Sequence, residues 1–153
     1  MSTPVATAPQ QAAPGSLPVN LRALLDEMIK RGASDLHITA GERPKLRVDG
    51  EVTNASIDYV LTPKDTLAIA YSILTEAQKK RFEIEDELDF SFGIQNLSRF
   101  RGNVFKQRQC VSMVVRQIPF TIKTADQLGL PGIITKLAER PRGLVLVTGP
   151  TGS

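Results

Sequence analysis

Residues 143–153 read G-L-V-L-V-T-G-P-T-G-S. The apolar run Leu144–Val147 has the composition of a strand buried on both faces, and it leads straight into a glycine-rich turn. A phosphate-binding loop begins in this way. Its full pattern is G-x-x-x-x-G-K-[ST], in which backbone N–H groups surround the phosphates, the lysine reaches the outer ones and the hydroxyl holds Mg²⁺. This chain carries only the first part, Gly149, Pro150, Thr151, Gly152 and Ser153, so an ordinary turn between a strand and a helix is an open alternative.

The residues before this stretch divide into a linker and a short helix. Residues 120–131 have no sustained apolar period and are bracketed by proline and glycine, which predicts a linker. Ile133, Ile134 and Leu137 then predict a short helix. A nucleotide-binding α/β domain needs several parallel strands joined by crossover helices, and the residues after the linker are too few for this. We therefore expect one whole α+β domain over residues 17–119 and only the first elements of a second domain over residues 132–153.

Composition is that of a soluble globular protein. The chain has 153 residues, 41% of them apolar and 23% charged, with a formal net charge of +3. This charge is too small to argue for nucleic-acid binding, and no apolar run approaches the ~20 residues that cross a bilayer. The single cysteine, Cys110, cannot form an internal disulfide, which favours a reducing cytoplasm. Residues 1–16 are uncharged and rich in Ala, Pro, Gln, Ser and Thr, so we expect a disordered tail and no secretory signal.

The expected α+β domain begins with an amphipathic helix. Asn20 can cap it, Gly32 ends it as a left-handed cap, and its apolar face is formed by Leu21, Leu24, Leu25, Met28 and Ile29. A strand follows over residues 33–39, with Asp35, His37 and Thr39 on the face opposite Leu36 and Ile38. Another strand over residues 45–48 meets Asp49-Gly50, a dipeptide typical of a tight hairpin, and the chain returns through Glu51-Val52.

Two helices and three strands complete this domain. Thr62-Pro63-Lys64-Asp65 predicts a helix start, with Leu67, Ala70, Tyr71 and Leu74 on one face. Thr75-Glu76-Ala77-Gln78 forms a capping box that starts another helix, running toward Phe82. Leu88, Phe90, Phe92 and Ile94 alternate with polar residues, which predicts a half-buried strand, and two more strands are expected over residues 99–107 and 110–117. The sheet should be antiparallel.

The last two strands place two arginines side by side. If they form a hairpin with Arg108-Gln109 at its bend, Arg101 lies opposite Arg116, on one face with Arg99, Asn103 and Ser112. The other face then carries Phe100, Val104, Val111, Met113 and Val115. A guanidinium group presents a planar fork that suits phosphate, so the pair is a candidate clamp on a triphosphate bound elsewhere. Two solvated arginines beside a core face are the alternative.

Other polar residues give no catalytic or metal-binding pattern. His37 stands near Ser34 and Asp35, but this spacing at a strand entry does not build a triad, and the chain has no second histidine for a metal site. An acidic cluster lacks the ligand spacing of a calcium loop, and we interpret it as a solvated helix end or an interaction surface: Glu83, Glu85, Asp86, Glu87 and Asp89. We expect no catalytic residue and no metal site within these residues.

Several short motifs occur together along the chain. They are Ala33-Ser34-Asp35-Leu36-His37, Arg47-Val48-Asp49-Gly50, Asp89-Phe90-Ser91-Phe92, Arg99-Phe100-Arg101-x-Asn103-x-Phe105-x-Gln107, Val115-Arg116-x-Ile118-Pro119 and the run from Pro141 to Ser153. In this combination the chain, from about Leu17 onward, resembles the PilT family, the type IV pilus retraction ATPases of the type II/IV secretion ATPase superfamily.

The resemblance implies a fold, a site and partners. The family is hexameric, with a PAS-like N-terminal domain that a flexible linker joins to a RecA-like α/β ATPase core, so the PAS-like domain would occupy residues 17–119. The resemblance also implies that Gly149–Ser153 begin the Walker A loop and that Arg101 and Arg116 reach ATP, bound with Mg²⁺ on the core. It further implies a homo-hexamer that is peripheral to the cytoplasmic face of the inner membrane, works with the inner-membrane pilus platform protein and binds no nucleic acid. Because the Walker A lysine and Walker B lie beyond Ser153, we expect these residues alone to be inactive in ATP hydrolysis.

Two other functions are open. One is a pilus assembly or type II secretion ATPase of the same superfamily; those usually carry an additional N-terminal domain, whereas only a short tail precedes the first helix here, which favours retraction. The other is a stand-alone PAS-like sensory or nucleic-acid-binding module. The sequence lacks a ligand-pocket signature and the interleaved exposed aromatic residues that stack on bases.

Overall fold

The computed structural model describes residues 19–149, which form two compact units with the boundary between Pro119 and Phe120. The tail predicted over residues 1–16 lies outside the described residues, as do the last four positions, 150–153. The first unit has the mixed α+β fold with an antiparallel sheet that the sequence predicts.

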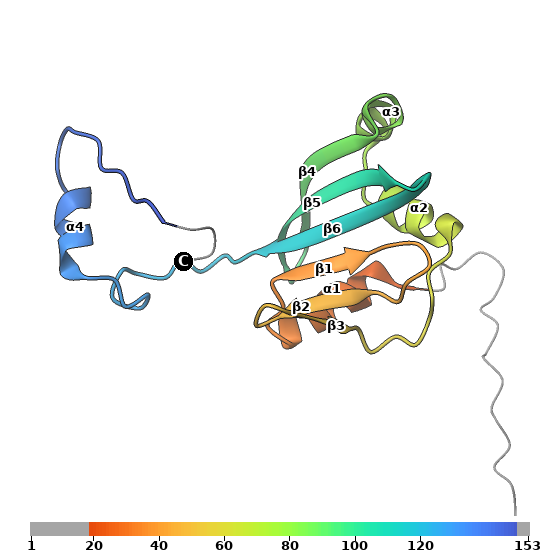
Figure 1. Ribbon diagram of the computed structural model, residues 1–153, viewed down its shortest axis with the longest axis horizontal. Helices are drawn as coiled ribbons and strands as arrows, with labels where there is room; N and C mark the ends of the chain where they lie inside the picture. Colours follow the sequence, from red (N-terminus) through yellow and green to blue (C-terminus); the bar gives the residue numbers. More distant parts are fainter. Residues whose placement is uncertain (1–18, 150–153) are drawn as a thin grey trace, which may run out of the picture. The chain divides into compact units, whose positions relative to one another are not determined.

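One sheet of six strands forms the first unit, in the order β3-β2-β1-β6-β5-β4 (Figure 1). The strands are β1 (Asp35–Ile38), β2 (Lys45–Val48), β3 (Glu51–Asn54), β4 (Glu87–Ile94), β5 (Ser98–Gln107) and β6 (Cys110–Ile118). All the neighbouring pairs are antiparallel. Because β1 pairs with β6, two segments far apart in the sequence meet at the centre of the sheet.

Helices cover one face of this sheet. They are α1 (Leu21–Lys30) and α2 (Pro63–Tyr71), while α3 (Glu76–Glu85) leads into the edge strand β4. The core joins apolar residues of α1 and α2 to alternate residues of the strands: Leu24, Leu25, Met28, Leu36, Ile38, Leu46, Ile69, Phe100, Val104, Met113 and Val115. Since successive side chains of a strand point to opposite faces, the remaining residues of the same strands lie on the other face.

The first helix begins and ends as its sequence predicts. The side chain of Asn20 accepts a hydrogen bond from the backbone N–H of Arg22 at 2.9 Å. Gly32 follows the helix with φ +62°, a left-handed conformation that glycine adopts without cost. The predicted apolar face is confirmed, because Leu21, Leu24, Leu25 and Met28 are buried and Ile29 packs against them.

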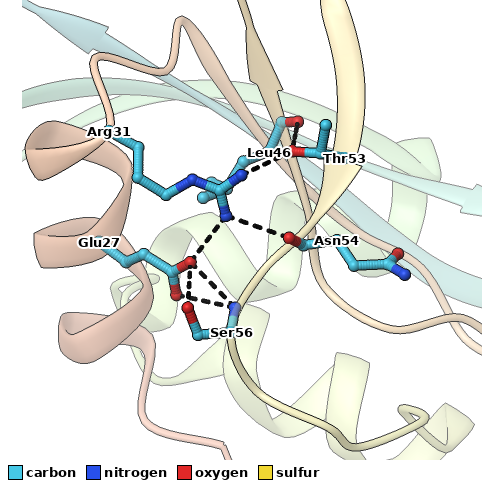
Figure 2. Close-up of polar contacts among 6 residues, drawn as sticks. All are labelled: Glu27, Arg31, Leu46, Thr53, Asn54 and Ser56. Atoms are coloured by element: carbon cyan, nitrogen blue, oxygen red, sulfur yellow. Dashed lines mark hydrogen bonds and ion pairs between the residues drawn. The ribbon is translucent and has the colours of Figure 1, made fainter.

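A polar network fastens the end of α1 to β3 and the segment that follows it (Figure 2). Arg31 donates to Oε1 of Glu27 at 2.9 Å, to Oγ1 of Thr53 at 2.8 Å and to the carbonyl of Asn54 at 3.1 Å. The Glu27 carboxylate also accepts from the backbone N–H and the hydroxyl of Ser56, at 2.9 and 2.8 Å. Burial alone would raise the pKa of Glu27, but the hydrogen bonds from Arg31 and Ser56 hold it below its usual value. The network therefore holds the N-terminal hairpin against the helix that supports it.

Two tight turns set the register of the hairpins. Asp49 and Gly50 have φ of 50° and 85°, and Arg108 and Gln109 have φ of 51° and 63°. Two successive residues with positive φ are typical of a type I′ turn, whose twist matches that of the flanking strands. The resulting register of β5 and β6 sets Arg101 opposite Arg116, as the sequence predicts.

The capping boxes of α2 and α3 are confirmed, but the predicted apolar face of α2 is partly wrong. Ala70 and Leu74 are buried as predicted, but Leu67 is 39% exposed, while Thr66 and Ile69 are buried. Helical spacing is compatible with a buried face through Leu67 and also with one through Thr66 and Ile69, so periodicity alone does not identify the buried face. The buried set continues from Asp65, whose side chain turns inward to accept hydrogen bonds from Thr62 and Tyr59.

The second unit contains a helix, α4 (Gly132–Ala138), at the predicted position. Residues 120–131 form turns without a described helix or strand. The strand predicted over Leu144–Val147 is not formed among the described residues, and these four side chains are 56–88% exposed. A strand needs a neighbouring strand for its backbone N–H and C=O groups, and residues 120–149 provide none.

Candidate functional site

The sheet face opposite α1 and α2 carries rows of charged residues, and we call it the open face. The pleat and the register place on it Asp35 and His37 of β1, Lys45 and Arg47 of β2, Glu87 and Asp89 of β4, Arg99, Arg101 and Asn103 of β5, and Val114 and Arg116 of β6. The alternation of apolar and polar residues along each strand is therefore what separates this surface from the core.

A concavity lies at the centre of the open face. Its volume is about 440 Å³, and its lining consists of Asp35, Glu87, Asp89, Arg101, Asn103, Val114 and Arg116. The two arginines singled out from the sequence are thus neighbours that share one hollow. Their side chains remain 65% and 68% exposed, so both guanidinium groups are accessible from solvent.

The buried side chain of Asp35 forms an ion pair with the exposed Arg116. Only 5% of the Asp35 side chain is exposed, and its Oδ1 accepts a hydrogen bond from Nε of Arg116 at 2.8 Å. Its other oxygen, Oδ2, accepts from the hydroxyl of Ser34 at 2.8 Å and lies 3.5 Å from Nε of Arg47. Burial would raise the pKa of Asp35, but the hydrogen bonds from Arg116 and Ser34 outweigh it and hold the pKa below its usual value. Asp35 is therefore a buried carboxylate held in its charged form.

Arg101 has a different partner on the neighbouring strand. Its terminal nitrogen donates to Oδ2 of Asp89 at 3.1 Å, and 54% of the Asp89 side chain is exposed. The hydrogen bond from Arg101 lowers the pKa of Asp89. Beside this pair, the amide of Asn103 donates to Glu87 at 3.3 Å. The concavity thus contains two arginines and three carboxylates, and an incoming anion would compete with a carboxylate at Arg101.

The other polar residues considered from the sequence, Ser34, His37 and Ser112, do not form a site together. The hydroxyl of Ser34 donates to Asp35, and Nε2 of His37 is buried without a hydrogen-bond partner among residues 19–149, so the three do not form a catalytic relay. Burial lowers the pKa of His37. Ser112 lies on the predicted face but is only 2% exposed, and it lines a separate hollow together with residues 39–42.

The predicted phosphate loop falls mostly outside the structure. Gly149 is exposed in irregular backbone, and Pro150, Thr151, Gly152 and Ser153 lie outside the described residues. Within residues 19–149, no three His, Cys, Asp or Glu side chains are arranged to hold a metal ion, and no helix is long and apolar enough to cross a membrane.

Sequence reasoning alone did not assign a role to Asp35 or Asp89. Alternation placed Asp35 on the polar face, but its contact with Arg116 depends on the pairing of β1 with β6, which joins residues 81 positions apart. Asp89 belongs to the acidic cluster and to the motif Asp89-Phe90-Ser91-Phe92, and neither pattern identifies its partner. The cross-strand position of Asp89 diagonal to Arg101 follows from the register of β4 with β5.

Comparison with known proteins agrees with this fold. No family model matches the chain. The chain is 42% identical over 135 residues to the type IV pilus retraction ATPase PilT of Pseudomonas aeruginosa, and the alignment covers 88% of the chain and 39% of that protein. The chain is a homologue of the PilT family. It is also 38% identical over 130 residues to the type IV pilus ATPase PilU of the same organism, which covers 85% of the chain and 34% of PilU.

A solved structure supports the same relationship. The crystal structure of the pilus retraction motor PilT with bound ADP matches with a TM-score of 0.75 and 42% identity, covering 88% of this chain and 39% of that one. The chain therefore spans about two-fifths of the length of PilT.

Proposed function

We propose that the chain is the N-terminal part of a hexameric P-loop ATPase that powers type IV pilus retraction, using ATP and Mg²⁺. The observation that carries the proposal is the 42% identity to PilT over nearly the whole chain, together with the matching fold. In this proposal residues 17–119 are the PAS-like domain, residues 120–131 the linker and residues 132–153 the start of the RecA-like core with the Walker A loop. The hexamer works at the cytoplasmic face of the inner membrane with the pilus platform protein.

The open face supports a role for the arginine pair in nucleotide binding. A guanidinium fork matches two phosphate oxygens, and Arg101 and Arg116 lie side by side on an exposed concavity. An exposed ion pair such as Arg101–Asp89 contributes only about 0–1 kcal/mol, so a triphosphate can displace Asp89 at little cost. We propose that both arginines contact the phosphates of a nucleotide bound on an ATPase core of the hexamer.

The exposed surface gives less support to the nucleic-acid alternative. Single-stranded nucleic acids bind to aromatic side chains on which the bases stack. Within residues 19–119, every aromatic side chain is buried or half-buried.

A gene deletion separates retraction from pilus assembly and from type II secretion. In a strain that makes type IV pili, loss of a retraction ATPase should abolish twitching motility and leave pili on the surface. Loss of an assembly ATPase should remove the pili, and loss of a secretion ATPase should leave motility intact while a secreted enzyme remains inside the cell. The last two results would each contradict the proposal.

Complementation then tests the arginine pair. The wild-type gene should restore twitching, whereas genes carrying Arg101→Ala or Arg116→Ala should not. Arg81→Ala is the matched control, because Arg81 is another exposed arginine paired with a carboxylate, Glu85, but belongs to α3 and does not line the concavity. If the Arg101 and Arg116 variants restore motility as Arg81→Ala does, the nucleotide contact is wrong.

A further inference from the structure

We propose that Asp35 is a positioning residue that fixes Arg116 for phosphate, whereas Arg101 is the arginine that exchanges its carboxylate partner for phosphate. This inference rests on the proposed function, because it assigns different tasks to the two arginines of the proposed nucleotide contact. It goes beyond that function by including a buried carboxylate in the site.

The two arginines are held by different nitrogen atoms. Arg116 meets Asp35 through Nε, which leaves both terminal nitrogens free of protein partners among the described residues. Arg101 meets Asp89 through a terminal nitrogen. A bidentate contact with phosphate uses two parallel N–H groups of a guanidinium, and the two terminal nitrogens provide one such pair. Arg116 can therefore present both terminal nitrogens to phosphate while Nε holds Asp35, whereas a phosphate on the terminal nitrogens of Arg101 competes with Asp89 for one of them.

The two carboxylates also differ in how firmly they are held. Asp35 is 5% exposed, and its second oxygen is oriented by the Ser34 hydroxyl at 2.8 Å and by Arg47 at 3.5 Å. Asp89 lies on the edge strand β4 and is 54% exposed. A buried charge must keep its partner, whereas a solvated one can lose it at little cost. Asp35 thus keeps Arg116 in one orientation before the nucleotide binds. The ion pair between Asp89 and Arg101 breaks when phosphate binds to Arg101.

A matched pair of charge-removing variants tests this difference. Asp35→Asn and Asp89→Asn each remove one negative charge beside the arginines, so simple electrostatics predicts that both lower the KM for ATP. The proposal predicts opposite results in steady-state ATP hydrolysis by the full-length hexamer with Mg²⁺. Asp89→Asn should lower the KM about two- to fivefold, because Arg101 no longer has to leave a partner. Asp35→Asn should lower kcat/KM about tenfold or more, because an amide oxygen holds the Arg116 guanidinium more weakly than a carboxylate does.

A second pair of variants leaves Asp35 in place, in case Asp35→Asn does not fold. Lysine carries a single nitrogen, so Arg116→Lys cannot hold Asp35 with one nitrogen while two others make a bidentate contact with phosphate. It should lower kcat/KM about as much as Arg116→Ala. In the proposal the residue at position 101 contacts either Asp89 or phosphate, and a lysine ammonium group can make either contact. Arg101→Lys should therefore keep more activity than Arg101→Ala. Thermal unfolding of each variant shows whether a loss of turnover comes from a loss of folded protein.

The outcomes separate this inference from the proposed function. If Arg101→Ala and Arg116→Ala hydrolyse ATP like the wild type, the nucleotide contact itself is wrong. If those two lose activity but Asp35→Asn lowers the KM as Asp89→Asn does, or Arg116→Lys matches the wild type, the positioning role of Asp35 is wrong and the nucleotide contact stands.

Discussion

Truncating Arg116 to alanine should destabilise the first unit, although 68% of this side chain is exposed. The substitution removes a hydrogen bond to a buried charge, because Nε of Arg116 lies 2.8 Å from Oδ1 of Asp35, which is almost fully buried. A hydrogen bond to a charged group contributes about 1.5–3 kcal/mol. Ser34 and the more distant Arg47 stay beside the carboxylate, and water can enter where the side chain was removed. We therefore expect a loss of about 1–2 kcal/mol in the free energy of unfolding.

Arg101→Ala is the matched comparison for this experiment. Both members of the Arg101–Asp89 pair are more than half exposed, and such a pair contributes little, so we expect a change of about 0–0.5 kcal/mol. From the sequence alone the two substitutions look equivalent, because neither residue lies on the core face. Urea unfolding of the chain at pH 7, followed by circular dichroism, measures both free energies.

The destabilisation by Arg116→Ala should also depend on pH. The hydrogen bonds of Asp35 outweigh its burial and hold its pKa below the ordinary value of 3.8. A carboxyl group with a lowered folded-state pKa stabilises the fold above its unfolded pKa, and this contribution is lost as the pH falls through the folded-state pKa. The difference between Arg116→Ala and the wild type should therefore be complete at pH 7 and shrink below about pH 4. Equal stabilities of the two proteins at pH 7, or an equal cost of Arg101→Ala, would refute this reasoning.

Three further outcomes can be checked. Phe100→Ala should cost about 3–5 kcal/mol in urea unfolding because the ring is fully buried, whereas Ile84→Ala, at an 84% exposed position, should change stability by less than about 0.5 kcal/mol. Gly102→Ala should cost about 1–3 kcal/mol, because its Cβ would meet an aromatic ring atom of β4 at 2.6 Å, whereas Gly93→Ala on β4 meets nothing within 4 Å and should cost less. Hydrogen exchange on the full-length protein should show residues 120–131 less protected than β4; equal protection would contradict a flexible linker there.

Local signals predicted most of the first unit. Asn20, the Thr62 and Thr75 capping boxes and the Asp49-Gly50 turn act on neighbouring residues, so their effect is visible in a short window of sequence. The arginine register was predictable for the same reason, because a two-residue turn fixes the pairing of the strands that it joins.

Features that depend on distant partners could not be predicted in this way. The buried face of α2 depends on how the helix packs against the sheet, so helical spacing could not tell which of Leu67 and Ile69 is more buried. The role of Asp35 requires the pairing of β1 with β6, and nothing in either segment specifies the other. Leu144–Val147 has the composition of a buried strand, but a strand forms only beside another strand.

The bend at Arg108 and Gln109 has a consequence for how this protein can vary. Both residues adopt positive φ, so other residues that tolerate it, such as Asn-Gly, can replace them without moving the strands. Adding or deleting one residue there would instead slip β6 by one position. Arg116 would then lie opposite Phe100 or Gly102 and point into the layer of helices. This hairpin therefore tolerates substitutions at the two turn residues, but not a change in the number of residues in the turn.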